Sequence, residues 1–211
     1  MLRKFLPAFL AAAIIGLPLS AGVTLPAFAQ SANAEPIRVR GGIVSFSGQT
    51  LTVETRAGEV FDIALLEGWM VSSVARAAVS DIRLGDFVGV TSLPEEGGGN
   101  GTLAVMIFPS GLPGPAEGSF EYDLQPNSTM TNATVADAVT GVNGRTVTVS
   151  YNGEEKKVEI PKGTPVVTYA PATQADLKPK AIVFILAEKG TDGAISTRHV
   201  VVGTNGVVPP M

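Results

Sequence analysis

The sequence contains no cysteine and only one histidine, His199. Without cysteine, no disulfide can stabilise the fold, and no lipid can be attached to a cysteine behind an export signal. A single histidine cannot supply the ligands of a zinc site when the thiolates are also missing. These absences exclude a disulfide-stapled scaffold, a lipoprotein and a zinc protein, so stability must come from buried apolar side chains.

Basic residues are also few, with 15 Lys and Arg against 19 Asp and Glu and a net charge of −4. Removal of an amino-terminal segment that holds Arg3 and Lys4 but no acid would leave −6. Proteins that bind nucleic acid need a basic surface, because phosphate contacts dominate their affinity. We therefore expect no nucleic-acid partner.

Long apolar runs are absent except at the start of the chain, from Phe5 to about Leu19. That run follows two basic residues and precedes Ala27-Phe-Ala29, which has the small-x-small pattern of a cleavage site. These features predict a signal peptide over residues 1–29, cleaved after Ala29, with Ala32-Asn-Ala34 as a second possible site. We expect a periplasmic protein with no membrane span in its mature chain.

One β-rich unit is written twice after this signal. Gly48-Gln-Thr-Leu-Thr-Val53 matches Gly144-Arg-Thr-Val-Thr-Val149, and Asp81-Ile-Arg-Leu-Gly-Asp-Phe-Val88 matches Asp176-Leu-Lys-Pro-Lys-Ala-Ile-Val183. The spacing between the copies stays near 95 residues, and its changes fall at expected turns, where chains tolerate insertions. A spacing this long predicts a separate domain for each copy rather than a solenoid.

Apolar and polar residues alternate through both copies, and no segment shows sustained helical periodicity. Five or six short strands per copy predict an all-β protein made of two tandem small OB-like β-barrels, with small β-sandwiches as the alternative. We place repeat 1 at residues 36–109, repeat 2 at residues 133–204 and a carboxy-terminal tail at residues 205–211. Barrel closure would protect the sheet edges of a chain that has no disulfides.

Residues 110–132 form a linker between the copies that is longer than most connections in compact domains. Its Phe120, Tyr122 and Met130 offer apolar anchors, which favour an ordered segment over a flexible tether. We expect this linker to pack across both barrels and fix their relative orientation, although a plain connector is the alternative.

The shared pattern resembles a known family. It runs Gly-x-Val-x-x-x-x-Gly-x-x-Leu-Thr-Val, then Asp-Ile-x-x-Gly-Asp-x-Val, then Gly-Thr-Leu before a last strand. It is similar to an uncharacterised bacterial domain of unknown function that is secreted and OB-like. The stretch Ser128–Val135 and the ending Val207–Met211 look like a two-copy proteobacterial subgroup, sometimes labelled a metal transporter permease. Beyond its signal, this chain lacks the spans that such a label requires. The resemblance supplies no catalytic residues.

Candidate site residues fall into two groups. Those that could form a ligand or partner surface are Trp69, Phe120, Tyr122, Asp123, Met130 and Asn132. Those expected to be structural are Asp81 and Asp176, as caps of a short helical turn, and Gly48 and Gly144, in turns. Other aromatic residues, including Tyr169, are more simply explained as core.

We expect no catalytic residue and no metal or cofactor site. His199 lies in a predicted strand, and no serine lies in a nucleophile-elbow sequence. The carboxylates Asp81, Asp86, Glu95 and Glu96 could hold a hard cation, but they lack the alternating spacing of a calcium loop.

The predicted function is that of a non-enzymatic periplasmic binding or scaffold protein, whose partner would be a protein, a glycan or another envelope component. The alternative is a periplasmic accessory factor that handles a metal or cofactor for an inner-membrane transport or redox system.

Overall fold

The architecture comes from a computed structural model, which describes residues 34–94, 100–110, 116–141 and 144–210. The predicted signal peptide lies outside these residues. The strands are β1 (Glu35–Phe46), β2 (Thr50–Thr55), β3 (Val60–Arg76), β4 (Phe87–Pro94), β5 (Asn100–Phe108), β6 (Gly118–Tyr122), β7 (Ser128–Gly141), β8 (Gly144–Tyr151), β9 (Glu154–Pro161), β10 (Val166–Pro171), β11 (Ile182–Lys189) and β12 (Ile195–Gly203). Two short 3₁₀ turns, η1 (Val79–Asp81) and η2 (Gln174–Asp176), complete the described elements.

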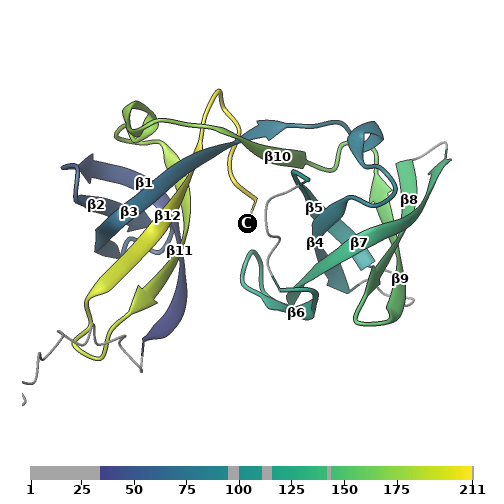
Figure 1. Ribbon diagram of the computed structural model, residues 1–211, viewed down its shortest axis with the longest axis horizontal. Coiled ribbons are helices and arrows are strands. Elements are labelled where there is room, and N and C mark those ends of the chain that lie inside the picture. The colour runs from purple at the N-terminus through teal and green to yellow at the C-terminus, as the bar shows by residue number, and fades with distance from the viewer. Residues whose placement is uncertain (1–33, 95–99, 111–115, 142–143, 211) are drawn as a thin grey trace, which may run out of the picture. The chain divides into compact units, whose positions relative to one another are not determined.

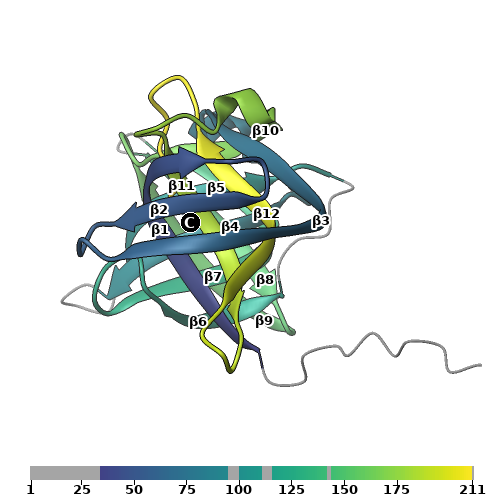
Figure 2. The same ribbon diagram turned by 90° about the vertical axis from the view of Figure 1, so that its left-hand side faces the viewer.

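Five strands close into a barrel. Antiparallel pairing joins β11 to β1, β1 to β2, β2 to β3 and β11 to β12. Parallel pairing of β12 with β3 completes the ring, whose strands face the viewer in Figure 2. The predicted all-β fold with a small closed barrel is confirmed, and the sandwich alternative does not apply to these strands.

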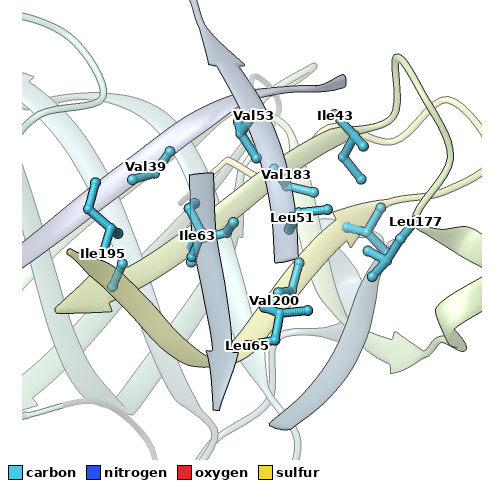
Figure 3. Close-up of a cluster of buried hydrophobic side chains, with 13 residues drawn as sticks. Val39, Ile43, Leu51, Val53, Ile63, Leu65, Leu177, Val183, Ile195 and Val200 are labelled. Atoms are coloured by element: carbon cyan, nitrogen blue, oxygen red, sulfur yellow. The ribbon is translucent and has the colours of Figure 1, made fainter. Parts of the chain in front are cut away.

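Apolar and polar residues alternate along the five strands, and the apolar side chains fill the barrel. Leu51, Val53 and Ile63 have no exposed surface, and Val39 and Ile185 are buried beside them. Figure 3 shows Val39, Leu51, Val53 and Ile63 together with Leu177 from the segment after η2. The period-2 pattern read from the sequence is therefore the pattern that builds the core.

A second row of strands runs β5-β4-β7-β8-β9, with antiparallel pairing throughout. Its inner face holds another core that includes Val88, Val90, Val147 and Val149. The Thr102 hydroxyl of β5 donates to the Glu159 carbonyl of β9, so the two ends of the row contact each other.

Strand pairing connects the ranges 36–109 and 133–204, in an arrangement that we call the exchange. The closed barrel takes β1, β2 and β3 from the range 35–76 and β11 and β12 from the range 182–203. The second row takes β4 and β5 from the range 87–108 and β7, β8 and β9 from the range 128–161. Figure 1 shows this exchange in colour, with purple β1 and yellow β12 in the same barrel.

The exchange passes through two crossed strands, β3 and β10. β3 has 17 residues, with a positive φ of 76° at Gly68, where its register with β12 shifts. Its last residues pair antiparallel with β10, through Val74 opposite Tyr169 and Ser72 opposite Pro171. β10 in turn pairs parallel with β5, as β3 does with β12. The same 95-residue spacing relates Val74 to Tyr169, so the crossing has pseudo-two-fold symmetry.

The predicted linker contains ordered strands. β6 pairs with the first part of β7, and β7 pairs with β4. Asp123, directly after β6, accepts a hydrogen bond of 2.7 Å from Arg40 of β1. The described part of this segment thus contacts both the closed barrel and the second row.

The exchanged pairing predicts which pair of introduced cysteines can be cross-linked. The natural chain has no cysteine that would compete with them. Pro36 and Glu188 are partners across β1 and β11. Directly opposed strand residues have the Cα separation that disulfides need. We expect the double variant Pro36→Cys/Glu188→Cys to oxidise to an intramolecular disulfide, detected by mass and by gel mobility.

The matched control is Pro36→Cys/Leu93→Cys. Leu93 is the first-copy counterpart of Glu188 at the 95-residue spacing, so this pair would be bridged if each copy closed its own barrel. Oxidation of the control pair, with Pro36→Cys/Glu188→Cys left reduced, would contradict the exchange.

Candidate functional site: an apolar cleft at the strand crossing

A cleft of about 890 Å³ lies against the crossing of β3 and β10. Its apolar lining comes from seven strands and the residue that follows β5. The apolar residues are Met70, Val71, Met106, Phe108, Pro109, Phe120, Met130, Ala170, Pro171, Phe184, Leu186 and Val201. The remaining residues are Arg38, Ser72, Gly89, Tyr122, Asn132, Tyr169 and His199. The lining residues come from the ranges 38–132 and 169–201, so the cleft exists only in the assembled fold.

Methionine is concentrated in this cleft. Of five methionines in the chain, the three that are not at its ends, Met70, Met106 and Met130, all line it. Met70 is 64% exposed, whereas Met106 and Met130 are buried. Unbranched, polarisable methionine side chains adapt to ligands of varied shape.

Aromatic rings form a row that starts at Phe87, behind the lining, and continues along the wall through Phe108, Tyr169 and His199. The Phe87 and Phe108 centroids are 5.7 Å apart, those of Phe108 and Tyr169 are 5.9 Å apart, and those of Tyr169 and His199 are 6.2 Å apart. The tilted geometry is favourable for aromatic pairs. Burial raises the pKa of Tyr169, with a smaller contribution from the charge of Tyr122, so the phenol stays neutral at physiological pH.

Ser72 and His199 meet across the pairing of β3 and β12. The Ser72 Oγ lies 2.8 Å from His199 Nε2, although the two residues are 127 positions apart. Burial lowers the pKa of His199 below 6.5, and no carboxylate contributes to that shift. The imidazole is therefore neutral at pH 7, and the pair is an uncharged hydrogen bond in an apolar surrounding.

Two arginines and one carboxylate meet beside the cleft. The guanidinium carbons of Arg38 and Arg40 lie 5.0 and 5.1 Å from the centroid of the Tyr122 ring. Asp123 accepts from Arg40 at 2.7 Å and lies 3.8 Å from Arg38. Burial would raise the pKa of Asp123, but the hydrogen bond and charge of Arg40 outweigh it and lower that pKa. Asp123 is therefore ionised at neutral pH.

Asn132 and Gly89 shape another part of the wall. The Asn132 amide nitrogen donates to the Ala116 carbonyl at 3.1 Å, and Asn132 is almost fully buried. A side chain at Gly89 would lie 3.1 Å from Asn132 Oδ1 and 3.3 Å from Met130 Sδ. Glycine at this position leaves space that a larger residue would fill.

The structure brings together four of the six residues predicted to form a surface. Phe120, Tyr122, Met130 and Asn132 all line the cleft. Asp123 lies beside it, where it pairs with Arg40 and lines a smaller cavity of about 490 Å³.

The sixth predicted residue, Trp69, lies elsewhere. It packs on the core of the closed barrel and contacts Phe46 edge-to-face, with ring centroids 5.8 Å apart. Trp69 is not among the residues that line the cleft.

The predicted caps need a correction. Asp81 and Asp176 are the third residues of the 3₁₀ turns, whose N-cap positions hold Ala78 and Thr173. Each carboxylate accepts the backbone N–H of its N-cap residue, at 2.7 Å for Asp81 and 2.8 Å for Asp176. Each aspartate therefore stabilises its turn as the acid of a capping box does, by accepting from the N-cap residue and not by occupying the N-cap position.

The two turn glycines have positive φ, 84° at Gly48 and 152° at Gly144. A side chain at Gly144 would also collide with the backbone carbonyl of Ile160. Both positions therefore favour glycine, and Gly144 requires it for close strand approach.

The carboxylates considered as cation ligands have other contacts. Asp81 caps its turn, and Asp86 accepts the Arg83 N–H at 2.7 Å. Glu95 and Glu96 lie outside the described residues. In the parts of the chain that the structure describes, no three His, Asp or Glu side chains are grouped as metal ligands.

Sequence reasoning missed Arg38, Ser72, Phe184, Leu186 and His199 as parts of one site. They come from β1, β3, β11 and β12, whose mutual pairing depends on the exchange. The one signal available in the sequence was methionine, because all three internal methionines gather here.

Comparison with known proteins finds no match to a family model, to a curated protein or to a solved structure. Over the described ranges, none of the helices has the length and apolar character needed to cross a bilayer.

The lowered pKa of His199 predicts a pH effect on stability. Near pH 7 the imidazole is neutral in both the folded and unfolded states. As the pH falls below about 6.5, the unfolded chain takes up the proton first, so the free energy of unfolding decreases. We expect His199→Gln to reduce this decrease between about pH 7.5 and 5.5, measured by urea denaturation at several pH values.

Ser72→Ala serves as the control, because it removes the hydrogen bond but keeps the titrating group. It should retain the pH dependence of the parent protein. An identical pH profile for His199→Gln and the parent would show that His199 does not cause the effect.

Proposed function

We propose that this chain is a non-enzymatic periplasmic binding protein that holds an apolar small molecule in the cleft at the strand crossing. The observation that carries the proposal is the gathering of all three internal methionines with five aromatic side chains, Phe108, Phe120, Tyr122, Tyr169 and Phe184, around one cavity. The predicted signal peptide supports export, and the family resemblance is consistent with it.

The repeated sequence supports two OB-like units that have exchanged strands within one chain. The closed barrel has five strands, and the parallel pair of β3 and β12 closes it. β10 forms the corresponding parallel pair with β5, the first strand of the second row. On this proposal the second row of strands forms the second OB-like unit, and the cleft lies where this unit meets the closed barrel.

Size and lining both favour a small-molecule site. Ligand pockets usually enclose about 300 to 1,000 Å³ and combine apolar walls with a few polar groups. The cleft's volume of about 890 Å³ lies in that range. Surface exposure of Leu186 (60%), Met70 (64%) and Phe120 (37%) leaves apolar area that a ligand would remove from water.

The same geometry favours binding over hydrolysis. A serine nucleophile needs a histidine base that a third group, usually a carboxylate, holds in position. Ser72 and His199 are in contact, but the described residues that line the cleft include no Asp or Glu. We therefore assign the pair to the structure of the wall.

Binding of a neutral apolar dye tests this proposal. N-phenyl-1-naphthylamine, which fluoresces in apolar surroundings, should bind the purified mature protein saturably. Leu186→Glu places a charge in the cleft and should weaken dye affinity by about tenfold or more, equivalent to about 1.4 kcal/mol. The measurement is a fluorescence titration.

Leu84→Glu is the matched control, since Leu84 is 72% exposed and lies outside the cleft. Its dye affinity should equal that of the parent protein. Absence of saturable binding by the parent, or equal affinity in both variants, would contradict the proposed site.

A further inference from the structure

This inference rests on the proposed function, that the cleft binds a small molecule. The charge at the edge of the cleft then indicates the chemical class of that ligand. Arg38 is the only residue with a formal charge at neutral pH among those described as lining it, because His199 is neutral there. Arg38 also lines the smaller neighbouring cavity, so this residue is shared by the two cavities.

The neighbouring carboxylate does not neutralise this position. Asp123 is 2.7 Å from Arg40 but 3.8 Å from Arg38, so its strong hydrogen bond is with Arg40. Two guanidiniums and one ionised carboxylate leave the cluster with one excess positive charge. An anionic group on a ligand would complement that charge through a bidentate contact with Arg38.

Other polar side chains of the cleft are already engaged with protein groups. Ser72 and His199 bind each other, and the Asn132 amide donates to the Ala116 carbonyl. A ligand with many hydroxyl groups, such as a glycan, would require several such side chains to form its hydrogen bonds. Their engagement favours a ligand whose polarity is confined to one end.

The three methionines indicate the chemistry of the apolar part of the ligand. Met70, Met106 and Met130 have unbranched, flexible side chains, which fit around a flexible chain without a fixed shape. We propose that the cleft binds an unbranched acyl chain that ends in a carboxylate, with the carboxylate held at Arg38 and the chain against the methionines and Phe184. No covalent step is involved.

Calorimetric titration with three probes of equal chain length tests this inference. The probes are dodecanoate, dodecanol and dodecylamine, each used below its aggregation concentration. Dodecanoate should bind about tenfold more tightly than dodecanol, as expected for a charge-assisted hydrogen bond, and dodecylamine should bind most weakly. In Arg38→Gln the preference for dodecanoate over dodecanol should disappear while dodecanol affinity is retained.

Arg83→Gln is the matched control, because it removes one positive charge from an exposed residue outside the cleft. It should keep the preference for dodecanoate. Equal binding of dodecanoate and dodecanol by the parent would overturn this inference but leave the apolar site intact. Failure of all three probes and of the neutral dye would overturn the proposed function itself.

A second measurement avoids dependence on a variant that could lose its fold, because Arg38 also stacks on Tyr122. In the parent protein, added salt should weaken dodecanoate binding and leave dodecanol binding unchanged or slightly stronger, since salt screens the exposed charge of Arg38. Dodecanoate affinity that is independent of salt would contradict the role of Arg38.

Discussion

The antiparallel pairing of β3 with β10 is the contact on which the rest of this structure depends. It brings together two strands that lie about 95 residues apart in the chain, with Val74 opposite Tyr169 at the centre. From this crossing, β3 continues into the closed barrel and β10 continues toward β5 in the second row. Each half of the fold is therefore completed by strands from distant parts of the chain, and a separate core of Val74, Met106, Phe108, Val167 and Val201 fills the junction.

The cleft is a consequence of this crossing. Met106 and Val201 belong both to the junction core and to the lining of the cleft, so the site rests directly on the packed crossing. Two copies that closed their own barrels would separate Arg38 from Leu186, which is its partner across β1 and β11. A ligand at this site would contact residues of both copies, and its binding would stabilise the exchanged arrangement by mass action.

Much of the local structure could be predicted from sequence. The alternation around Leu51 and Val53 identifies buried positions of β2, because strand side chains alternate between faces. The linker residues Phe120, Tyr122 and Met130 were found because large apolar residues in a long connection need a surface to pack on. The sequence around Asp81 predicts a capped turn, but this aspartate is the acid of a capping box and not the N-cap residue. Sequence alone does not separate the two roles, because an aspartate can fill either.

The strands, their buried faces and the glycine turns follow from the residue order alone, because they depend on alternation and on backbone conformations set by neighbouring residues. The pairing of β11 and β12 with β1 and β3 in the closed barrel depends on long-range packing, which local sequence does not specify. Both copies carry the same strand pattern, so a barrel closed by its own strands and one closed by exchanged strands satisfy the same local preferences. The difference lies in the long β3 and its non-local pairing with β10, and this pairing also joins Arg38, the methionines and His199 in one cleft.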